Sequence, residues 1–248
     1  MTVVTALTIA GSDSGGGAGI QADLKTFLDR KVYGMSVITA LTAQNTLGVH
    51  GVHLVPPDFV KAQLRAVFDD LPVGAIKIGM VGDAARIDAV ADVLEALTVR
   101  PPIVLDPVMI AKGGAPLLDP DAVAALKARL VPLATVVTPN LPEAEVLGAL
   151  AHAAAVLRKG GHGEGPVVVD ILEIAGREVA RWEHPRVATR NTHGTGCTLA
   201  ACVATELARG AGLVEACAAG VAYVGELVRA GGVAVGSGCG PLGHGGWV

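Results

Sequence analysis

The 248-residue sequence is poor in aromatic residues, has no excess of basic residues and contains no long uninterrupted apolar run. Aromatics make up 3% of the chain, and the 19 Lys and Arg are outnumbered by 23 Asp and Glu, so nucleic acid is not an expected partner. The apolar stretch from Leu213 to Val228 is too short to span a bilayer and contains two glutamates. The segment from Met1 to Ala10 lacks the basic start of a signal peptide. We expect a soluble, cytoplasmic protein with no membrane partner.

The chain has only four cysteines, without a Cys-x-x-Cys pair and without histidines at zinc-binding spacing. We expect free thiols. Because composition does not change along the chain, residues 1–248 should form a single domain. The mean hydropathy of +0.53 is high and is typical of strands buried on both faces. It also fits an interface between copies, so we expect a homodimer.

Short β-branched runs alternate with longer stretches of helical periodicity. This alternation predicts an α/β fold with a doubly wound, mostly parallel sheet and helices on both faces. Two runs that flank Gly176, 167–172 and 178–183, predict a small antiparallel hairpin extension. The expected strands are 3–10, 36–42, 75–79, 102–105, 135–138 and 156–159. The expected helices are 18–28, 57–70, 83–97, 119–130, one from Pro142, 195–209 and 213–229, and Asp83 and Asp119 are candidate caps.

Polar and glycine residues follow the expected parallel strands. In an open parallel sheet, ligands bind beyond the carboxyl ends of the strands. We therefore expect one edge of the sheet to carry the chemistry. The strand-end residues are Gly11 with the loop to Gly19, Gln44 with Asn45, Met80, Asp106, Asn140, and Lys159 with Gly160 and Gly161.

The segment Asn191-Thr-His-Gly-Thr-Gly-Cys197 leads directly into an expected helix. The backbone N–H groups of Gly194, Thr195, Gly196 and Cys197 can bind a phosphate at the positive end of that helix, and the same field favours a thiolate at Cys197. A plain tight turn with a small buried cysteine is the alternative. His193 and Cys197 could also form a cysteine hydrolase pair, but this loop does not place an imidazole against the thiol.

The loop from Gly11 to Gly19 is neither a Walker A motif nor a Gly-x-Gly-x-x-Gly motif. Its four glycines after Ser14 exceed what a plain turn needs, which indicates a backbone that a ligand approaches closely. Asp23, one turn into the following helix, is either a surface charge or an acceptor for a substrate hydrogen bond.

Two carboxylates follow neighbouring strands. Asp106 and Glu143 form the sparse set that holds Mg²⁺ beside nucleotide phosphates. A buried charge at Asp106 and a simple helix-dipole interaction at Glu143 are the alternatives. Lys159 and Lys112 are candidate counter-charges for phosphate.

Several motifs in one order resemble the ribokinase-like kinases, and within them the hydroxymethylpyrimidine and phosphomethylpyrimidine kinases of thiamin biosynthesis. The resemblance depends on the segments 6–27, 38–46, 77–80, 105–109, 111–114, 138–145, 159–162 and 191–198. It implies phosphorylation of 4-amino-5-hydroxymethyl-2-methylpyrimidine by ATP to its monophosphate, and of the monophosphate to the diphosphate.

The resemblance also implies a role for each matching residue. The pyrimidine pocket would be lined by Gly11, Asp23, Gln44, Met80 and Val108, with Gln44 reading the aminopyrimidine edge. The ATP and magnesium site would comprise Asn140, Lys159 and Thr195 for ATP and Asp106 and Glu143 for Mg²⁺. The backbone from Gly194 to Cys197 would form the anion hole, with Cys197 where much of the superfamily has an aspartate base.

One segment departs from the family pattern. Between Glu145 and Lys159 relatives typically have a longer stretch with an extra helix, so we expect a compressed crossover to the sixth strand. Two alternatives therefore stay beside the main interpretation. One is a pyridoxal or pyridoxine kinase of the same superfamily. The other is a catalytically idle, pyrimidine-binding regulatory protein.

Overall fold

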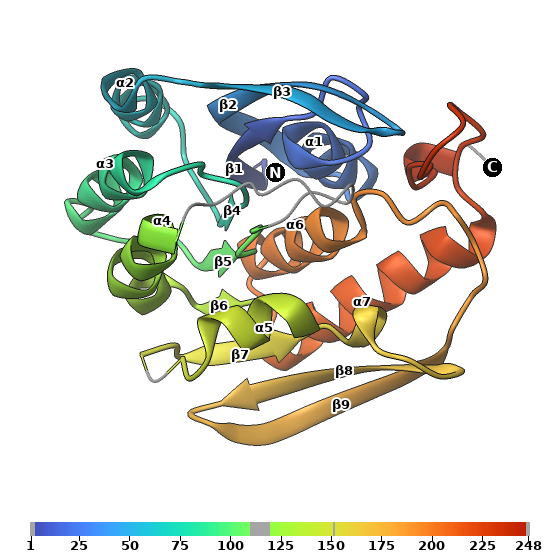
Figure 1. Ribbon diagram of the computed structural model, residues 1–248. Helices are drawn as coiled ribbons and strands as arrows, with labels where there is room; N and C mark the ends of the chain where they lie inside the picture. Colours follow the sequence, from blue (N-terminus) through green and yellow to red (C-terminus); the bar gives the residue numbers. More distant parts are fainter. Residues whose placement is uncertain (1–2, 110–119, 151, 247–248) are drawn as a thin grey trace.

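The computed structural model describes residues 3–109, 120–150 and 152–246, and the strands among them form one nine-stranded sheet (Figure 1). Its order is β3-β2-β1-β4-β5-β6-β7-β8-β9. The strands from β2 to β7 in this order pair in parallel, and both edges of the sheet are antiparallel. The parallel strands are β1 (Thr5–Ser12), β2 (Tyr33–Asn45), β4 (Ile76–Ile78), β5 (Ile103–Leu105), β6 (Val136–Val137) and β7 (Ala155–Arg158). The edge strands are β3 (Gly48–Leu54), β8 (Val167–Ile174) and β9 (Arg177–Pro185).

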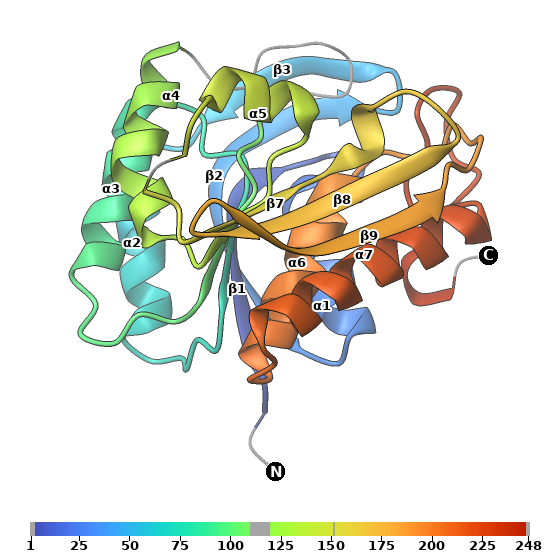
Figure 2. The ribbon, with the colours of Figure 1, turned by 90° about the horizontal axis from the view of Figure 1, so that it is seen from below.

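Helices cover both faces of the sheet (Figures 1 and 2). One face packs against α1 (Gly19–Asp29), α6 (Thr195–Ala208) and α7 (Leu213–Ala230). The other packs against α2 (Pro57–Phe68), α3 (Ala84–Glu95) and α4 (Pro120–Ala125), and α5 (Leu141–Leu147) adds Leu147 to the same core. The doubly wound, mostly parallel α/β fold and its antiparallel hairpin extension are thereby confirmed.

Alternation along the short central strands divides the core into two layers. Ile76 and Ile78 of β4 belong to the larger core beneath α2 and α3. Because side chains alternate across a strand, Lys77 between them faces the α1 and α6 side. Val104 of β5 lies in the core beneath α6 and α7. A buried lysine therefore stands on the face of the sheet that packs against α1 and α6.

Two helix starts follow from side-chain caps. The Asp83 carboxylate accepts a hydrogen bond from the Arg86 N–H at 3.0 Å and begins α3, as expected. Asn140 and Glu143 form a reciprocal capping box at the start of α5. The expected cap Asp119 lies outside the described residues.

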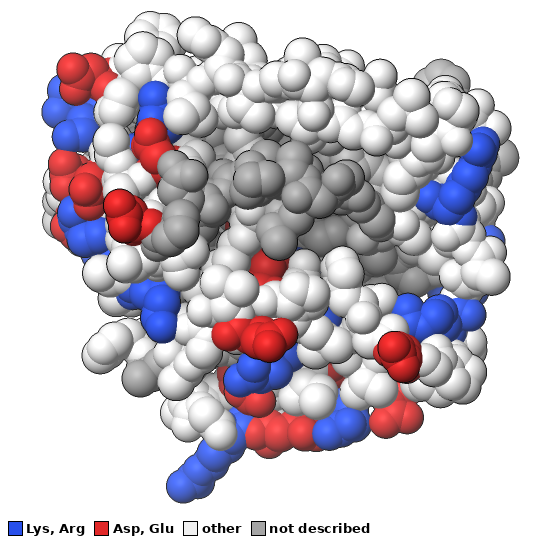
Figure 3. Space-filling view, viewed as in Figure 1, with Lys and Arg blue, Asp and Glu red and all other residues white. Residues whose placement is uncertain are grey.

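Charged side chains gather over α2, α3 and α4 on the left of Figure 3. There Arg129 pairs with Asp88, Asp92 and Glu95, and Lys61 also pairs with Asp92. These exposed pairs connect neighbouring helices and contribute little to stability individually. Among the described helices, none combines the length and apolarity needed to cross a membrane. The four cysteines are all free, as expected.

Candidate active site

A cavity of about 690 Å³ lies at the carboxyl ends of the parallel strands. Strand β1 has β2 on one side and β4 on the other. The connections between strands therefore diverge at the carboxyl end of β1 and leave a crevice there. Almost all of the predicted site residues line it, from loops that are far apart in the sequence. They are Gly11, Gln44, Met80, Asp106, Val108, Asn140, Glu143, Lys159, Gly194, Thr195, Gly196 and Cys197.

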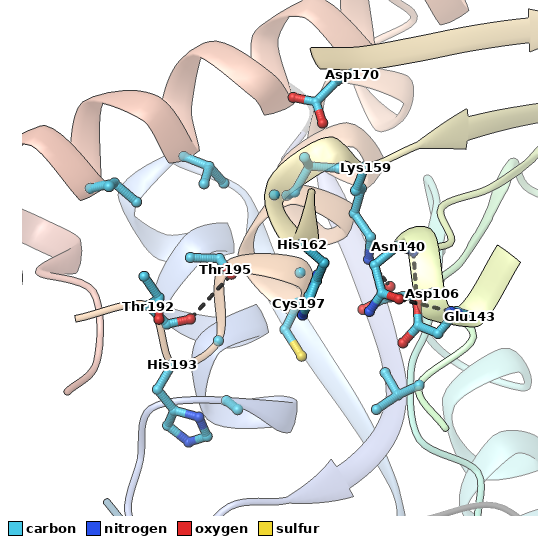
Figure 4. Close-up of a pocket in the computed structure, with 18 of the residues that line it drawn as sticks. Asp106, Asn140, Glu143, Lys159, His162, Asp170, Thr192, His193, Thr195 and Cys197 are labelled. Carbon is cyan, nitrogen blue, oxygen red and sulfur yellow. Dashed lines mark hydrogen bonds and ion pairs between the residues drawn. The ribbon is translucent and has the colours of Figure 1, made fainter. Parts of the chain in front are cut away.

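The anion loop, residues 191–197, ends in the first turn of α6 (Figure 4). Gly194 is its N-cap and has φ of +81°, a left-handed conformation. A Cβ atom at Gly194 would lie 1.9 Å from the carbonyl oxygen of Gly17, so glycine is required for this loop to touch the loop after β1. Gly196 and Cys197 follow in the first turn, where N–H groups lack intrahelical partners. The site thus has the backbone donors that an anion needs.

A buried ion pair lies next to this turn. The Lys159 ammonium is 2.6 Å from Asp106 Oδ1, which also accepts a hydrogen bond from Thr138. A Cβ atom at Gly196 would lie 3.1 Å from Lys159 Nζ, so the ammonium is close to the anion loop. Burial lowers the pKa of Lys159, but the charges of Asp106 and Glu143 outweigh burial, so the pKa is raised. Lys159 therefore stays a cation where a phosphate would bind.

Glu143 is fixed by the capping box. Its Oε2 accepts from the Asn140 N–H at 2.8 Å, and the Met109 N–H also hydrogen-bonds to the carboxylate. Burial, with a smaller effect of Asp106, raises the pKa of Glu143 to about 7 against the opposing effect of Lys159. Both carboxylates line the cavity, and no group of three or more metal-ligating side chains occurs among the described residues. Two carboxylates at one cavity fit Mg²⁺, because this ion keeps several water ligands and needs only one or two carboxylates from the protein.

The compressed crossover leaves Lys159 in place. Helix α5 ends at Leu147 and β7 begins at Ala155. The Lys159 N–H donates to the Pro139 carbonyl at 2.9 Å, and Lys159 pairs in parallel with Asn140. Backbone pairing at the ends of β6 and β7 thus positions this lysine for the ion pair without an extra helix.

The loop after β1 is organised by Asp13, which sequence reasoning missed. The Asp13 carboxylate accepts from the N–H groups of Gly15, Gly17 and Ala18 at 2.8, 3.0 and 2.9 Å. Burial raises its pKa, but the hydrogen bond from His193 and the backbone N–H groups outweigh burial and lower it. An Asp followed, after one serine, by three glycines was the available signal, because such a carboxylate commonly caps a turn.

The expectation for Asp23 needs correction. Its side chain is fully buried, and the residue is not among the described residues that line the cavity. Asp23 Oδ2 instead lies 2.8 Å from Lys77 Nζ and accepts from Thr8 at 2.6 Å. Lys77 does line the cavity. Helix α1 turns the carboxylate toward the sheet, so the lysine is the member of the pair that a ligand meets.

The protonation expected for Cys197 is also corrected. Burial raises the pKa of the Cys197 thiol to about 11, although the Lys77 charge lowers it. The helix N-terminus is thus not sufficient to make a thiolate, because removal from water disfavours the charge more strongly. The side chain still lines the cavity, and His193 lies apart from it (Figure 4). His193 pairs with Asp13, which agrees with the sequence argument against a hydrolase pair.

Arginine and histidine residues near the edge hairpin also reach the cavity and had no sequence signal. Arg186 donates to the carbonyl oxygens of Gly161, Gly163 and Gly165, each at 2.8 Å. It therefore holds the loop after Lys159 in shape. The neighbouring pair of Asp170 and His184 lines the same wall. Lys112, the second expected counter-charge, lies outside the described residues.

A family model described as phosphomethylpyrimidine kinase matches residues 13–243. The chain belongs to this family. A hydroxymethylpyrimidine/phosphomethylpyrimidine kinase from Rhizobium meliloti is 49% identical over an alignment that covers 98% of this chain and 97% of that protein. The thiamine biosynthesis bifunctional protein ThiED of Geobacter sulfurreducens is 51% identical over 96% of this chain. This member of the family spans about half of that longer protein, since the match covers 51% of it.

A solved structure resembles this phosphomethylpyrimidine kinase family member over nearly its whole length. It is an ADP complex of Bacillus subtilis pyridoxal kinase, with a TM-score of 0.88, 36% identity and 98% of each chain covered. A nucleotide product is therefore bound by a neighbour of the same fold. The names of these relatives, pyrimidine kinase and pyridoxal kinase, refer to two different acceptors within one fold.

Proposed function

We propose that this protein phosphorylates 4-amino-5-hydroxymethyl-2-methylpyrimidine with ATP, and then phosphorylates the monophosphate to the diphosphate, in thiamine biosynthesis. One observation supports this most strongly. A single cavity joins the acceptor loops around Gly11 and Gln44 to the Lys159–Asp106 pair beneath the anion loop. The names of the full-length relatives point to the same acceptor class.

In this proposal the chain mainly positions the reactants and stabilises charge. Lys159, Asn140 and Thr195 bind ATP, and the backbone of the anion loop accommodates the transferred phosphoryl group. Asp106 and Glu143 hold Mg²⁺, which neutralises phosphate charge when bound. The acceptor oxygen forms a bond to the γ-phosphorus while the bond to the β–γ bridging oxygen breaks and ADP leaves.

Cys197 has a different task in the two steps. The alcohol must lose its proton, whereas a phosphate monoester, with a second pKa near 6, is already largely ionised. The Cys197 thiol, whose pKa is raised by burial, first releases its proton to water, and the resulting thiolate then takes the proton of the alcohol. Replacement Cys197→Ala should therefore slow the first transfer by about 10²–10⁴-fold and the second far less. Equal losses in both steps would leave only a role for the backbone.

An ADP-release assay with separate acceptors tests the function. The pyrimidine alcohol, its monophosphate and pyridoxine are supplied one at a time with ATP and Mg²⁺. Turnover on both pyrimidines above that on pyridoxine supports the proposal. Higher turnover on pyridoxine would favour the pyridoxal kinase alternative, and tight pyrimidine binding without ADP release would favour the idle regulatory protein.

We also propose a cytoplasmic homodimer. The four free thiols suit a reducing compartment. Exposed apolar side chains on the hairpin of β2 and β3, among them Leu41 and Val52, offer a surface for a second copy. Light scattering coupled to gel filtration measures the mass. A monomer at micromolar concentration would contradict the dimer.

A further inference from the structure

The side chain of Gln44 lies between two groups that decide how its amide is oriented. Its backbone is fixed first, because the Gln44 N–H donates to Ser14 Oγ at 2.8 Å and Ser14 Oγ donates to the Gln44 carbonyl at 2.7 Å. In the recorded orientation the amide Oε1 lies 3.2 Å from Thr42 Oγ1, and the amide Nε2 lies 3.3 Å from His193 Nε2. The side chain lines the cavity.

His193 can only donate from Nε2. This nitrogen lies 2.8 Å from Asp13 Oδ2, and an ionised carboxylate only accepts hydrogen bonds. The N–H groups of Gly17 and Ala18 reach the same oxygen and favour its ionised form. His193 Nε2 therefore carries a hydrogen and has no lone pair for an amide N–H. The Nε2 hydrogen is directed at Asp13, and of the two amide atoms of Gln44 only the carbonyl oxygen can share it. We therefore place the carbonyl oxygen, and not the NH₂ group, toward His193.

Thr42 leads to the same assignment from the other side. Its hydroxyl has one hydrogen, and Oγ1 donates at 2.9 Å to the carbonyl oxygen of Ser12. Toward Gln44 the hydroxyl oxygen is therefore an acceptor, which suits the amide NH₂ group. The nitrogen and oxygen of a glutamine amide have nearly the same shape, so the hydrogen-bond partners decide between its two orientations.

The imidazole has little freedom to leave this position. A Cβ atom at Gly17 would lie 2.4 Å from His193 Cδ2, so the ring packs closely against the loop after β1. The His193 backbone N–H donates to the carbonyl of Gly240 at 3.0 Å. The loop after β1 thus limits the ring, and the C-terminal segment holds the backbone of His193.

We propose that His193 is a positioning residue that sets acceptor specificity by holding the Gln44 carbonyl on the side of the anion loop and the Gln44 NH₂ on the side of Thr42. The inference rests on the proposed function. An aminopyrimidine presents an amino donor beside a ring-nitrogen acceptor, so a fixed order of acceptor and donor on Gln44 recognises it. A pyridoxine ring has no such amino group. If the amide were inverted, its NH₂ would face the amino group of the pyrimidine and its carbonyl oxygen would face the ring nitrogen. Donor would then meet donor, and acceptor would meet acceptor.

Two variants of His193 separate positioning from structural support. His193→Leu removes the donor, while Asp13 keeps its three backbone donors, so the loop should stay folded. His193→Gln is the matched control, because its amide nitrogen can place a donor near the position of Nε2. For each variant kcat/KM is measured with the pyrimidine alcohol and with pyridoxine, and the folded fraction is checked by thermal unfolding.

We expect His193→Leu to lower the ratio of pyrimidine to pyridoxine kcat/KM by about tenfold or more, mainly through KM for the pyrimidine. His193→Gln should keep the ratio within about threefold of wild type. An unchanged ratio in His193→Leu, or an equal loss of the ratio in both variants, would overturn the inference. If the wild-type chain releases no ADP with any acceptor, the proposed function fails. Calorimetric binding of the two ring compounds to the same variants then still tests the positioning role.

Discussion

Replacing Lys77 with methionine measures how much the buried ion pair of Lys77 and Asp23 contributes to the stability of the fold. Lys77 and Asp23 are both fully buried and 2.8 Å apart, and the second carboxylate oxygen, Asp23 Oδ1, has no hydrogen-bond partner. In Lys77→Met the carboxylate keeps only the Thr8 hydroxyl. Breaking a buried pair from one side costs about 3–5 kcal/mol, a large part of a total of about 5–15 kcal/mol. For a domain of this size the melting temperature should fall by about 6–20 °C.

The double variant Asp23→Leu/Lys77→Met supplies the control. It removes both charges and fills the space with apolar groups, and such replacements of buried pairs are often neutral or stabilising. We expect it to regain at least about 2 kcal/mol over Lys77→Met, with the unsatisfied Thr8 hydroxyl keeping about 1 kcal/mol of the loss. Denaturant unfolding at pH 7 measures all three proteins. The reasoning is refuted if Lys77→Met unfolds within about 1 kcal/mol of wild type, or if the double variant is no more stable than Lys77→Met.

Three further outcomes follow from the site. Iodoacetamide alkylation of Cys197, followed by mass spectrometry of its peptide, should keep rising up to pH 10, because the thiol pKa is about 11; a plateau near pH 8 would contradict this. Since the pKa of Glu143 is raised from 4.5 to about 7, the folded protein keeps a proton that the unfolded chain loses between these values. Stability is therefore lost as pH rises through this window, and Glu143→Gln should gain about 2–3 kcal/mol at pH 8 but little at pH 4.5 in urea unfolding. Gly194→Ala should abolish most turnover because its Cβ would collide with Gly17, whereas Gly210→Ala, also at positive φ but in open space, should cost only stability in thermal unfolding.

The alternation of strands and helices was sufficient to predict the central sheet, because strands buried on both faces give continuous apolar runs. The parallel pairing from β2 to β7 agrees with that pattern, whereas the order of the strands was not predicted. Strand β3 was not predicted as a separate element. Its sequence, Gly48–Leu54, contains two glycines and two histidines, and most of its residues are exposed. It forms because its backbone pairs with β2, for example Leu41 with His53, and such pairing leaves no apolar period in the sequence.

The strand-end rule located the site, because parallel strands deliver their carboxyl ends to one edge of the sheet. The rule does not give side-chain direction. Asp23 was expected in the pocket, but α1 turns it toward the sheet, and Lys77 stands there instead. A lysine between two isoleucines in a buried strand was the available signal. The three-carbonyl contact of Arg186 has no counterpart in the sequence, since it depends on how a distant loop closes.

For Cys197, the position in the sequence and the burial in the fold favour opposite shifts of the thiol pKa. The sequence correctly placed Cys197 in the first turn of a helix, where the dipole favours an anion. The degree of burial around the thiol depends on segments far away in the chain, and its cost exceeds the dipole effect. Electrostatic predictions from sequence are therefore safest where a group stays in water.

Each of the two buried lysines in the cavity carries its own counterion, Asp23 for Lys77 and Asp106 for Lys159. Seen from the solvent, these pairs are dipoles rather than cations, and their field decays quickly with distance. A polyphosphate that enters the cavity therefore exchanges partners with the two lysines. Arg186 and Arg229 line the same cavity, and neither pairs with a carboxylate of the described residues. The dependence of the nucleotide's association rate on ionic strength should consequently come from these two arginines and not from the lysines.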